Sequence, residues 1–133
     1  MAEAHDTHHP VGVGLYYEDQ KAEALRRAKE FCENRIPKFL GWFDTILARN
    51  PEGDAHLVGR ALTTADLSLF QLVEGLAYAF PKATARALKK TPRVAALHEA
   101  VARRPRIKAY CESPRRIPFN EEGIFRHYPE LDR

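Results

Sequence analysis

The stretch Val58-Gly59-Arg60-Ala61-Leu62-Thr63-Thr64-Ala65-Asp66-Leu67-Ser68-Leu69-Phe70 contains several separate signals for the start of a helix. Thr63 has the side chain of an N-cap residue, and Asp66 stands three positions later, where its carboxylate can reach back to the N–H of residue 63. Leu62 and Leu67 have the spacing of a hydrophobic staple. The Asp66 carboxylate also suits the positive end of the helix dipole. We therefore expect a helix whose N-cap is Thr63.

Apolar residues cover most of the circumference of this predicted helix from residue 67 to residue 80. A narrow stripe of this segment is weakly polar, and it consists of Ser68, Gln71, Gly75 and Tyr78. A helix that is apolar on nearly all sides has to be enclosed by other parts of the protein. The sequence therefore predicts that this helix lies at the centre of a larger bundle.

The size and the cysteine content are typical of a single domain that needs no disulfide or metal site for stability. A chain of 133 residues buries roughly two thirds of the surface that its unfolded form exposes. Cys32 and Cys111 are far apart and form no CxxC motif, which argues against a disulfide framework or a structural zinc site. No apolar run approaches the roughly 20 residues that cross a bilayer, and the N-terminus does not resemble an export signal. We expect a cytoplasmic protein with no membrane partner.

The charge pattern is typical of solvated helix surfaces. The net charge of +3 arises from 21 basic and 18 acidic residues that are interleaved along the chain. The densest basic groups come late and lack interleaved aromatic residues that could stack on bases. They are Arg103, Arg104, Arg106, Arg115 and Arg116. Nucleic-acid binding through these arginines is a minor hypothesis, and we expect no nucleic-acid partner.

Helical spacing dominates the rest of the sequence, and strand signals are nearly absent. From about residue 21 to residue 49, apolar residues recur at intervals of three and four and form one face of a long helix. Pro37 falls inside this segment, removes one N–H and crowds the carbonyl of Glu33, so we expect a bend there. Residues 50–54 then form a loop before the central helix.

Three shorter helical segments and a tail are expected after Phe80-Pro81. A basic helix is predicted around residues 84–90, and a second helix begins with Thr91 as the N-cap. A third short helix follows Pro105. The tail from residue 115 to residue 133 carries too many apolar residues for free disorder, so we expect it to pack back over the bundle.

This order of elements resembles the C-terminal domain of glutathione transferases, in particular the sigma-like and mu-like branches and their bacterial relatives. Four segments are similar to the bacterial relatives beyond topology: residues 5–10 (HDTHHP), 15–19 (LYYED), 35–40 (RIPKFL) and 113–119 (SPRRIPF). The resemblance implies an all-α fold, with five to six helices around the central capped helix and one domain over residues 1–133. It also implies a long first helix, although Pro10, Gly12 and Gly14 make that segment less regular than usual.

The reaction that the resemblance implies is the attack of the glutathione thiolate on an electrophile. This chemistry requires a donor that stabilises the thiolate, a site for the charged ends of glutathione and an apolar pocket. In the family, the donor and most glutathione contacts lie in an N-terminal thioredoxin-like domain, which these 133 residues do not include. We therefore expect the electrophile-binding and dimer-forming half of such an enzyme, inactive alone, with glutathione as co-substrate and no cofactor.

Two residues are candidates for substrate contacts by the same resemblance. Similar enzymes have an aspartate on the first helix of this domain that reaches the α-amino group of glutathione in the neighbouring subunit, and Asp6 matches it. Ten residues later, Tyr16 falls where mu-like members place a tyrosine whose hydroxyl faces the electrophile. Alternatively, Asp6 is a solvated acid at the end of a helix and Tyr16 is a packing aromatic.

Three histidines near the N-terminus raise the question of a metal site. His5 and His9 are four residues apart and could share a helix face, but the sequence identifies no further ligand and Pro10 disrupts the geometry. We expect a solvated or interface cluster and no metal, although His8 stands between them.

A second function from a different class remains open at this point. A helical bundle of this kind can serve as a free-standing, non-catalytic module for protein interaction. The sequence does not distinguish this hypothesis from the enzymatic one.

Overall fold

The computed structural model of the protein describes residues 1–132. The helices of this part of the chain are α1 (Ala2–His5), η1 (Tyr17–Gln20), α2 (Lys21–Glu30), η2 (Phe31–Arg35), α3 (Ile36–Arg49), α4 (Thr64–Ala79), α5 (Pro81–Leu88), α6 (Pro92–Ala102), α7 (Pro105–Cys111) and η3 (Pro129–Leu131). These residues contain no strand, and the predicted all-α class is confirmed. None of these helices combines the length and the apolar character that crossing a membrane requires.

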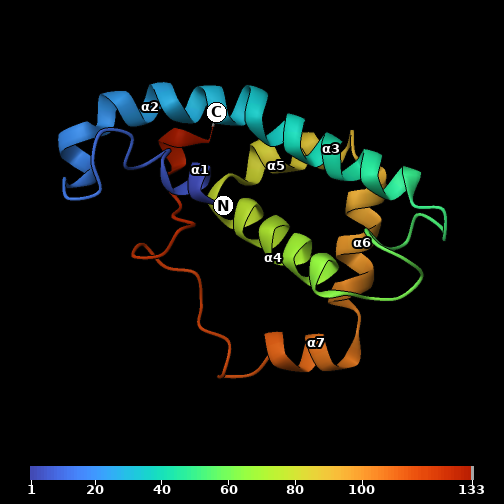
Figure 1. The fold of residues 1–133 in the computed structure, drawn as a ribbon. Coiled ribbons are helices and arrows are strands. Elements are labelled where there is room, and N and C mark those ends of the chain that lie inside the picture. Colours follow the sequence, from blue (N-terminus) through green and yellow to red (C-terminus); the bar gives the residue numbers. More distant parts are fainter. Residues whose placement is uncertain (133) are drawn as a thin grey trace.

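The long helix is a continuous rod that runs from α2 through η2 into α3, and its direction changes along its length (Figure 1). The segment η2 is π-helical and ends just before α3, in which Pro37 is among the first residues. Because proline cannot donate to the carbonyl of Glu33, the wider turn of a π-helix accommodates the lost hydrogen bond. The bend expected near Pro37 is therefore present, and it is built as a π-helical segment.

The start of α4 has the predicted capping box between Thr63 and Asp66. The Thr63 N–H donates to Asp66 Oδ2 over 2.7 Å. The other carboxylate oxygen, Oδ1, accepts from the N–H of Leu57 over 2.8 Å, so the same buried side chain also holds the preceding loop. Leu62 and Leu67 of the predicted staple both pack against the core.

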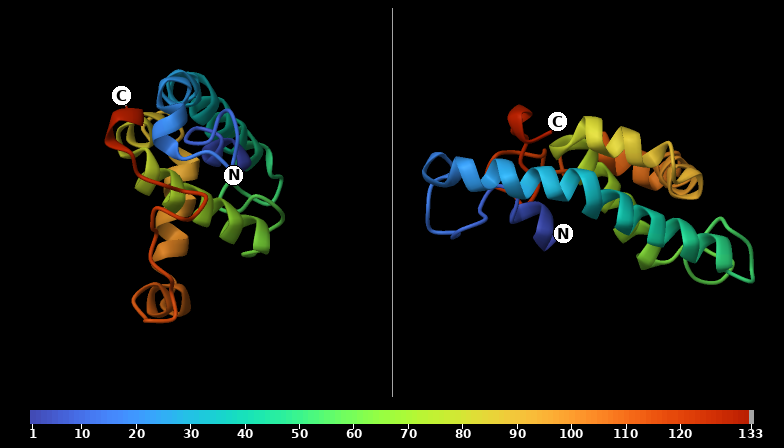
Figure 2. Two further views of the ribbon diagram at one scale, coloured as in Figure 1. Left: turned by 90° about the vertical axis from the view of Figure 1, so that its left-hand side faces the viewer. Right: turned by 90° about the horizontal axis from the view of Figure 1, so that it is seen from above.

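The helix α4 lies in the middle of the fold, with α5 and α6 on one side and the returning tail on another (Figures 1 and 2). Its buried residues are Asp66, Leu69, Phe70, Val73, Gly75, Leu76 and Ala79. Our placement of Gly75 in a polar stripe was wrong, because the ring of Phe125 covers it. A Cβ atom added to Gly75 would lie 2.4 Å from this ring, so only glycine allows this approach.

The helix α5 begins at Pro81, three residues before the predicted start at residue 84. Proline suits the first position of a helix, where no N–H is needed. The free N–H groups of the first turn are taken by Asp132 from the far end of the chain. Its Oδ2 accepts from Lys82 over 2.7 Å, and its Oδ1 accepts from Ala83 over 3.0 Å.

The helix α6 begins at Pro92, directly after Thr91, as predicted. Thr91 does not cap it through its side chain, because its hydroxyl donates to the carbonyl of Ala87 over 3.1 Å. Instead Asp44 of α3 accepts from the N–H groups of Arg93 and Val94 over 2.8 and 3.3 Å. A carboxylate from another helix therefore takes the role that the sequence assigned to Thr91.

The tail from residue 115 onward returns across the bundle and ends beside α2, as predicted (Figure 1). Phe119 stacks on Tyr78 with ring centroids 4.9 Å apart. The thiol of Cys32 donates to the carbonyl of Leu131 over 3.6 Å. Burial raises the pKa of this thiol to about 12, which agrees with the predicted core position of Cys32.

The predicted long first helix is wrong. The helix α1 ends at His5, and residues 6–16 form turns and irregular segments. Pro10 removes a backbone donor, and glycines at positions 12 and 14 disfavour a helix. The buried side chain of Gln20 replaces the missing helical bonds by accepting from the N–H groups of Val11 and Gly12 over 3.0 and 3.3 Å. Asp6 and Tyr16 therefore do not lie on one helix.

Candidate functional site

Asp6 lies directly after α1, at its C-cap position. Its side chain is 50% exposed, and one carboxylate oxygen is 3.8 Å from Nδ1 of His5. The carboxylate is therefore accessible to a ligand that approaches the end of α1.

Tyr16 is the residue before η1 and is 83% exposed. Its backbone is extended, and its side chain lines an open pocket of about 530 Å³. The other lining residues are His9, Val13, Gly14, Leu15, Tyr17, Glu18, Arg126 and Tyr128. The pocket thus combines mixed polar and apolar walls with a phenol that is open to solvent.

The neighbouring Tyr17 has a structural role. It is buried, stacks on Tyr128 with ring centroids 3.9 Å apart, and donates its hydroxyl to Glu130 over 3.1 Å. Burial, followed by the contact with Glu130, raises the pKa of the Tyr17 hydroxyl. Of the two adjacent tyrosines, Tyr16 is therefore the one that is open to solvent.

Charged side chains surround this pocket. The Nζ atom of Lys21 lies 3.1 Å from a Glu130 oxygen and 3.6 Å from a Glu18 oxygen. The ion pair with Glu130 holds the start of α2 to the tail. On the other side, Arg126 donates from Nη1 to Nε2 of His9 over 3.0 Å. The rim therefore carries both an acidic edge and a cation.

The three histidines lie together. The ring centroids of His5, His8 and His9 are 4.9 to 5.1 Å apart, and the rings of His5 and His9 are stacked. Burial lowers the pKa of His8 to about 4 and also lowers the pKa of His9, so both rings are uncharged at neutral pH. The structure thus places His8 beside the pair that the sequence had suggested.

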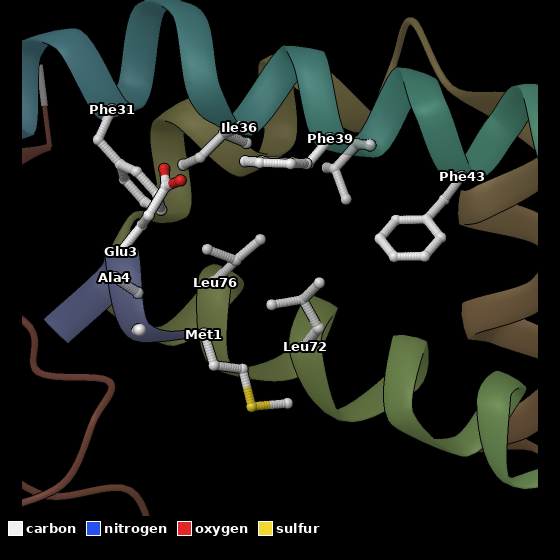
Figure 3. Close-up of a pocket in the computed structure, with 11 residues that line it drawn as sticks. Met1, Glu3, Ala4, Phe31, Ile36, Phe39, Phe43, Leu72 and Leu76 are labelled. Carbon is white, nitrogen blue, oxygen red and sulfur yellow. The ribbon is translucent and has the colours of Figure 1, made fainter.

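A second pocket of about 380 Å³ lies between the N-terminus, the long helix and α4 (Figure 3). Its walls are almost entirely apolar, with Phe39 and Phe43 from α3 facing Leu72 and Leu76 from α4. Glu3 closes one rim through an ion pair with Arg35, with N–O distances of 2.6 and 2.8 Å. Neither Asp6 nor Tyr16 lines this second pocket, which separates it from the predicted substrate residues.

The family model described as glutathione S-transferase, C-terminal domain, matches residues 5–114. This chain belongs to the glutathione transferase family. The order of helices, the capped α4 and the position of the match agree with the predicted C-terminal helical domain. The expected family and its C-terminal helical domain are therefore confirmed.

Individual glutathione transferases are also similar to this chain. A glutathione S-transferase from Dirofilaria immitis is 28% identical over 104 residues, which cover 76% of this chain and 48% of that protein. Glutathione S-transferase P from Capra hircus is 29% identical over 113 residues, which cover 84% of this chain and 50% of that protein. The chain thus spans about half the length of these two relatives, and a glutathione transferase-related role is supported.

Several residues around Tyr16 were missed in the sequence. Val13 and Leu15 lie in an irregular segment with Gly12 and Gly14, and their only signal was their apolar character. Arg126 and Tyr128 come from the tail, more than a hundred residues away, so no local pattern could have placed them beside Tyr16. The transferase fold itself brings these parts together.

The late arginines do not form one free basic surface. Arg103 pairs with Glu99 over 2.7 Å, and Arg116 pairs with Glu74 over 3.1 Å. Such pairing reduces the charge that these two side chains offer to a phosphate backbone.

Proposed function

We propose that this chain provides the electrophile-binding and dimer-forming half of a glutathione transferase. The intact enzyme would join the glutathione thiolate to an apolar electrophile. The observation that carries the proposal is the pocket beside Tyr16, in a chain that belongs to this family. A cytoplasmic location and glutathione as co-substrate, with no cofactor, are parts of the same proposal.

Tyr16 is proposed to contact the electrophile. The pocket offers Val13 and Leu15 for an apolar group, and the exposed phenol can donate to an oxygen on which negative charge develops during the reaction. The buried Tyr17 supports this wall by fixing the start of η1. The walls and the donor thus match the two needs of an electrophile site.

Asp6 is proposed to bind the α-amino group of glutathione held by the neighbouring subunit. Its carboxylate is half exposed at the end of α1, and it lies outside the lining of the Tyr16 pocket. A separate position is what such a contact needs, because the amino group of glutathione is distant from its sulfur. A charge-assisted hydrogen bond would hold that end of the peptide.

Binding of a small aromatic electrophile analogue tests the role of Tyr16. We expect 1,3-dinitrobenzene, which has no leaving group, to shift amide resonances of residues 13–17 in a two-dimensional NMR titration of the 133-residue chain. Tyr16→Ala is expected to weaken binding about tenfold through loss of the aromatic contact, and Tyr16→Phe much less. Asp6→Asn should leave this binding unchanged, because Asp6 lies outside the lining of the pocket.

The control for this titration is Tyr110→Ala, since Tyr110 is a partly exposed tyrosine on α7 outside the pocket. It should bind like the wild type. Equal dissociation constants for the wild type and Tyr16→Ala, or shifts that map only to the pocket of Figure 3, would contradict the proposed electrophile site. The chain alone is expected to give no conjugation above the uncatalysed rate.

The homodimer is proposed from the family and from apolar side chains on one side of α3. Phe39 and Trp42 are three residues apart on this helix and are 38% and 60% exposed. Large exposed apolar side chains that share a helix face are typical of an interface. We expect a dimer at micromolar concentration by sedimentation velocity and a monomer for Trp42→Glu. A wild-type chain that sediments only as a monomer would contradict a dimer formed by these residues alone.

A further inference from the structure

We propose that His5, His8 and His9 form a three-imidazole binding site for a divalent metal ion of the zinc type. One nitrogen of each ring can be chosen so that all three lie within 4.8 Å of one another. Three imidazoles with an open fourth position are a ligand set that Zn²⁺ uses in proteins. This inference does not rest on the proposed electrophile site.

His8 is oriented as a metal ligand would be. Its Nε2 lies 3.2 Å from the carbonyl oxygen of Ile124, and because a carbonyl only accepts, Nε2 carries the hydrogen and donates it. The lone pair is then on Nδ1. This atom is buried, since His8 is only 1% exposed, and it has no hydrogen-bond partner within residues 1–132. A buried nitrogen lone pair without a partner is costly unless something binds it.

His9 has a hydrogen-bond donor beside each of its ring nitrogens. The Arg126 guanidinium can only donate, and it contacts Nε2 over 3.0 Å, which favours the lone pair on that atom. Nδ1 lies 3.0 Å from the amide nitrogen of Gln20, which also donates to the carbonyls of Gly12 and Leu15. The lone pair of His9 therefore already faces a cation.

His5 lies near a carboxylate. Its Nδ1 is 3.8 Å from an oxygen of Asp6, which is too long for a hydrogen bond, so either ring nitrogen can offer its lone pair to an ion. Metal-binding histidines almost always direct their other N–H to a carboxylate or a backbone carbonyl. His8 meets this requirement through the carbonyl of Ile124.

The cluster is close to the geometry of a bound ion but has to contract. In a tetrahedral zinc site, Zn–N bonds of 2.0–2.1 Å place the nitrogens about 3.3 Å apart. The separation of up to 4.8 Å therefore has to shrink by at most about 1.5 Å. His5 lies at the end of the short helix α1, and His9 is in the turns that follow, so small side-chain rotations can supply this movement.

Arg126 occupies the position of the cation. Its Nη1 is 3.0 Å from His9, and its other nitrogens donate to the carbonyls of Gly123 and Glu122. A metal ion would have to displace this one side chain, which leaves an open coordination position toward the pocket of Tyr16. Arg126 is thus a competitor of the metal, which gives the inference a direct test.

Calorimetric titration of the untagged 133-residue chain with Zn²⁺ tests the site. We expect one ion to bind per chain, while Mg²⁺ should not bind, because imidazole suits zinc and copper better than hard cations. Loss of one ligand in His8→Ala or His5→Gln is expected to weaken zinc binding more than about 100-fold, since even second-shell changes cost 10–100-fold. Arg126→Met is expected to tighten it about tenfold, because no charge-assisted hydrogen bond has to be broken.

The matched control is His98→Gln. His98 hydrogen-bonds to Glu74 over 2.8 Å and lies outside the cluster, so its loss should leave the zinc affinity unchanged. His5→Gln keeps the test valid if the buried His8→Ala variant does not fold, because His5 is partly exposed. The inference is overturned if the wild type binds no zinc at millimolar concentration, if His5→Gln binds zinc as the wild type does, or if Arg126→Met binds it more weakly.

Discussion

Asp66→Ala is expected to lower the free energy of unfolding by about 3 kcal/mol, since each hydrogen bond to a charged group contributes about 1.5–3 kcal/mol. The fully buried carboxylate accepts from the N–H of Thr63 over 2.7 Å and from the N–H of Leu57 over 2.8 Å. Alanine would leave both donors without an acceptor. The measurement is urea denaturation followed by circular dichroism.

Thr63→Ala is a milder change in the same capping box. It removes only the hydroxyl of the N-cap, so a smaller loss of about 0.5–2 kcal/mol is expected. The loop ahead of α4 should keep its protection from amide exchange in Thr63→Ala and lose it in Asp66→Ala, because only Asp66 holds Leu57. Denaturation midpoints equal to that of the wild type would show that the capping box does not stabilise the fold.

Asp132→Ala is expected to have an effect of similar size, about 3 kcal/mol, although the residue is next to the last of the chain. Its carboxylate is 1% exposed and accepts from Lys82 over 2.7 Å and from Ala83 over 3.0 Å. Without it, the first turn of α5 loses its acceptor and the tail loses an anchor. Hydrogen exchange should therefore become faster in α5 and in residues 119–131, whereas α6 changes less.

Asp132→Asn separates the two bonds of this cap. The amide oxygen can accept from one N–H, but the amide nitrogen would face the other donor, so about half of the loss should remain. Asp54→Ala is the surface control, because Asp54 is exposed and pairs with Arg93 at 3.4 Å. A change within about ±0.5 kcal/mol is expected. Full stability of Asp132→Ala would mean that the tail is held by its apolar contacts alone.

The sequence predicted α4 well because its signals are local. Thr63 and Asp66 lie within one turn of each other, and the staple joins neighbouring residues. The same holds for Pro92 at the start of α6 and for the bend near Pro37. Hydrogen bonds between residues three or four positions apart depend little on the rest of the fold, so a sequence pattern is sufficient.

The prediction of a long first helix was wrong for a related reason. The resemblance implied a long helix, but Pro10 and the glycines at positions 12 and 14 already opposed it, and the local signals proved stronger. The candidates Asp6 and Tyr16 were named from this resemblance, and their roles stay predictions. The sequence could not predict the walls around Tyr16, because Arg126 and Tyr128 belong to the tail, which is remote from Tyr16 along the chain.

Local sequence patterns and the resemblance were sufficient to predict the all-helical class, the capped helix at the centre, the bend of the long helix and the family. The caps that Asp132 gives to α5 and Asp44 gives to α6, and the cover that Phe125 gives to Gly75, became known only from the folded chain. The tertiary structure also decided that His8 joins His5 and His9. These caps and ring contacts join segments that are remote along the chain, so they form only when packing of the core has brought the segments together. A local sequence pattern holds no information on such contacts, because it reports only on residues a few positions apart.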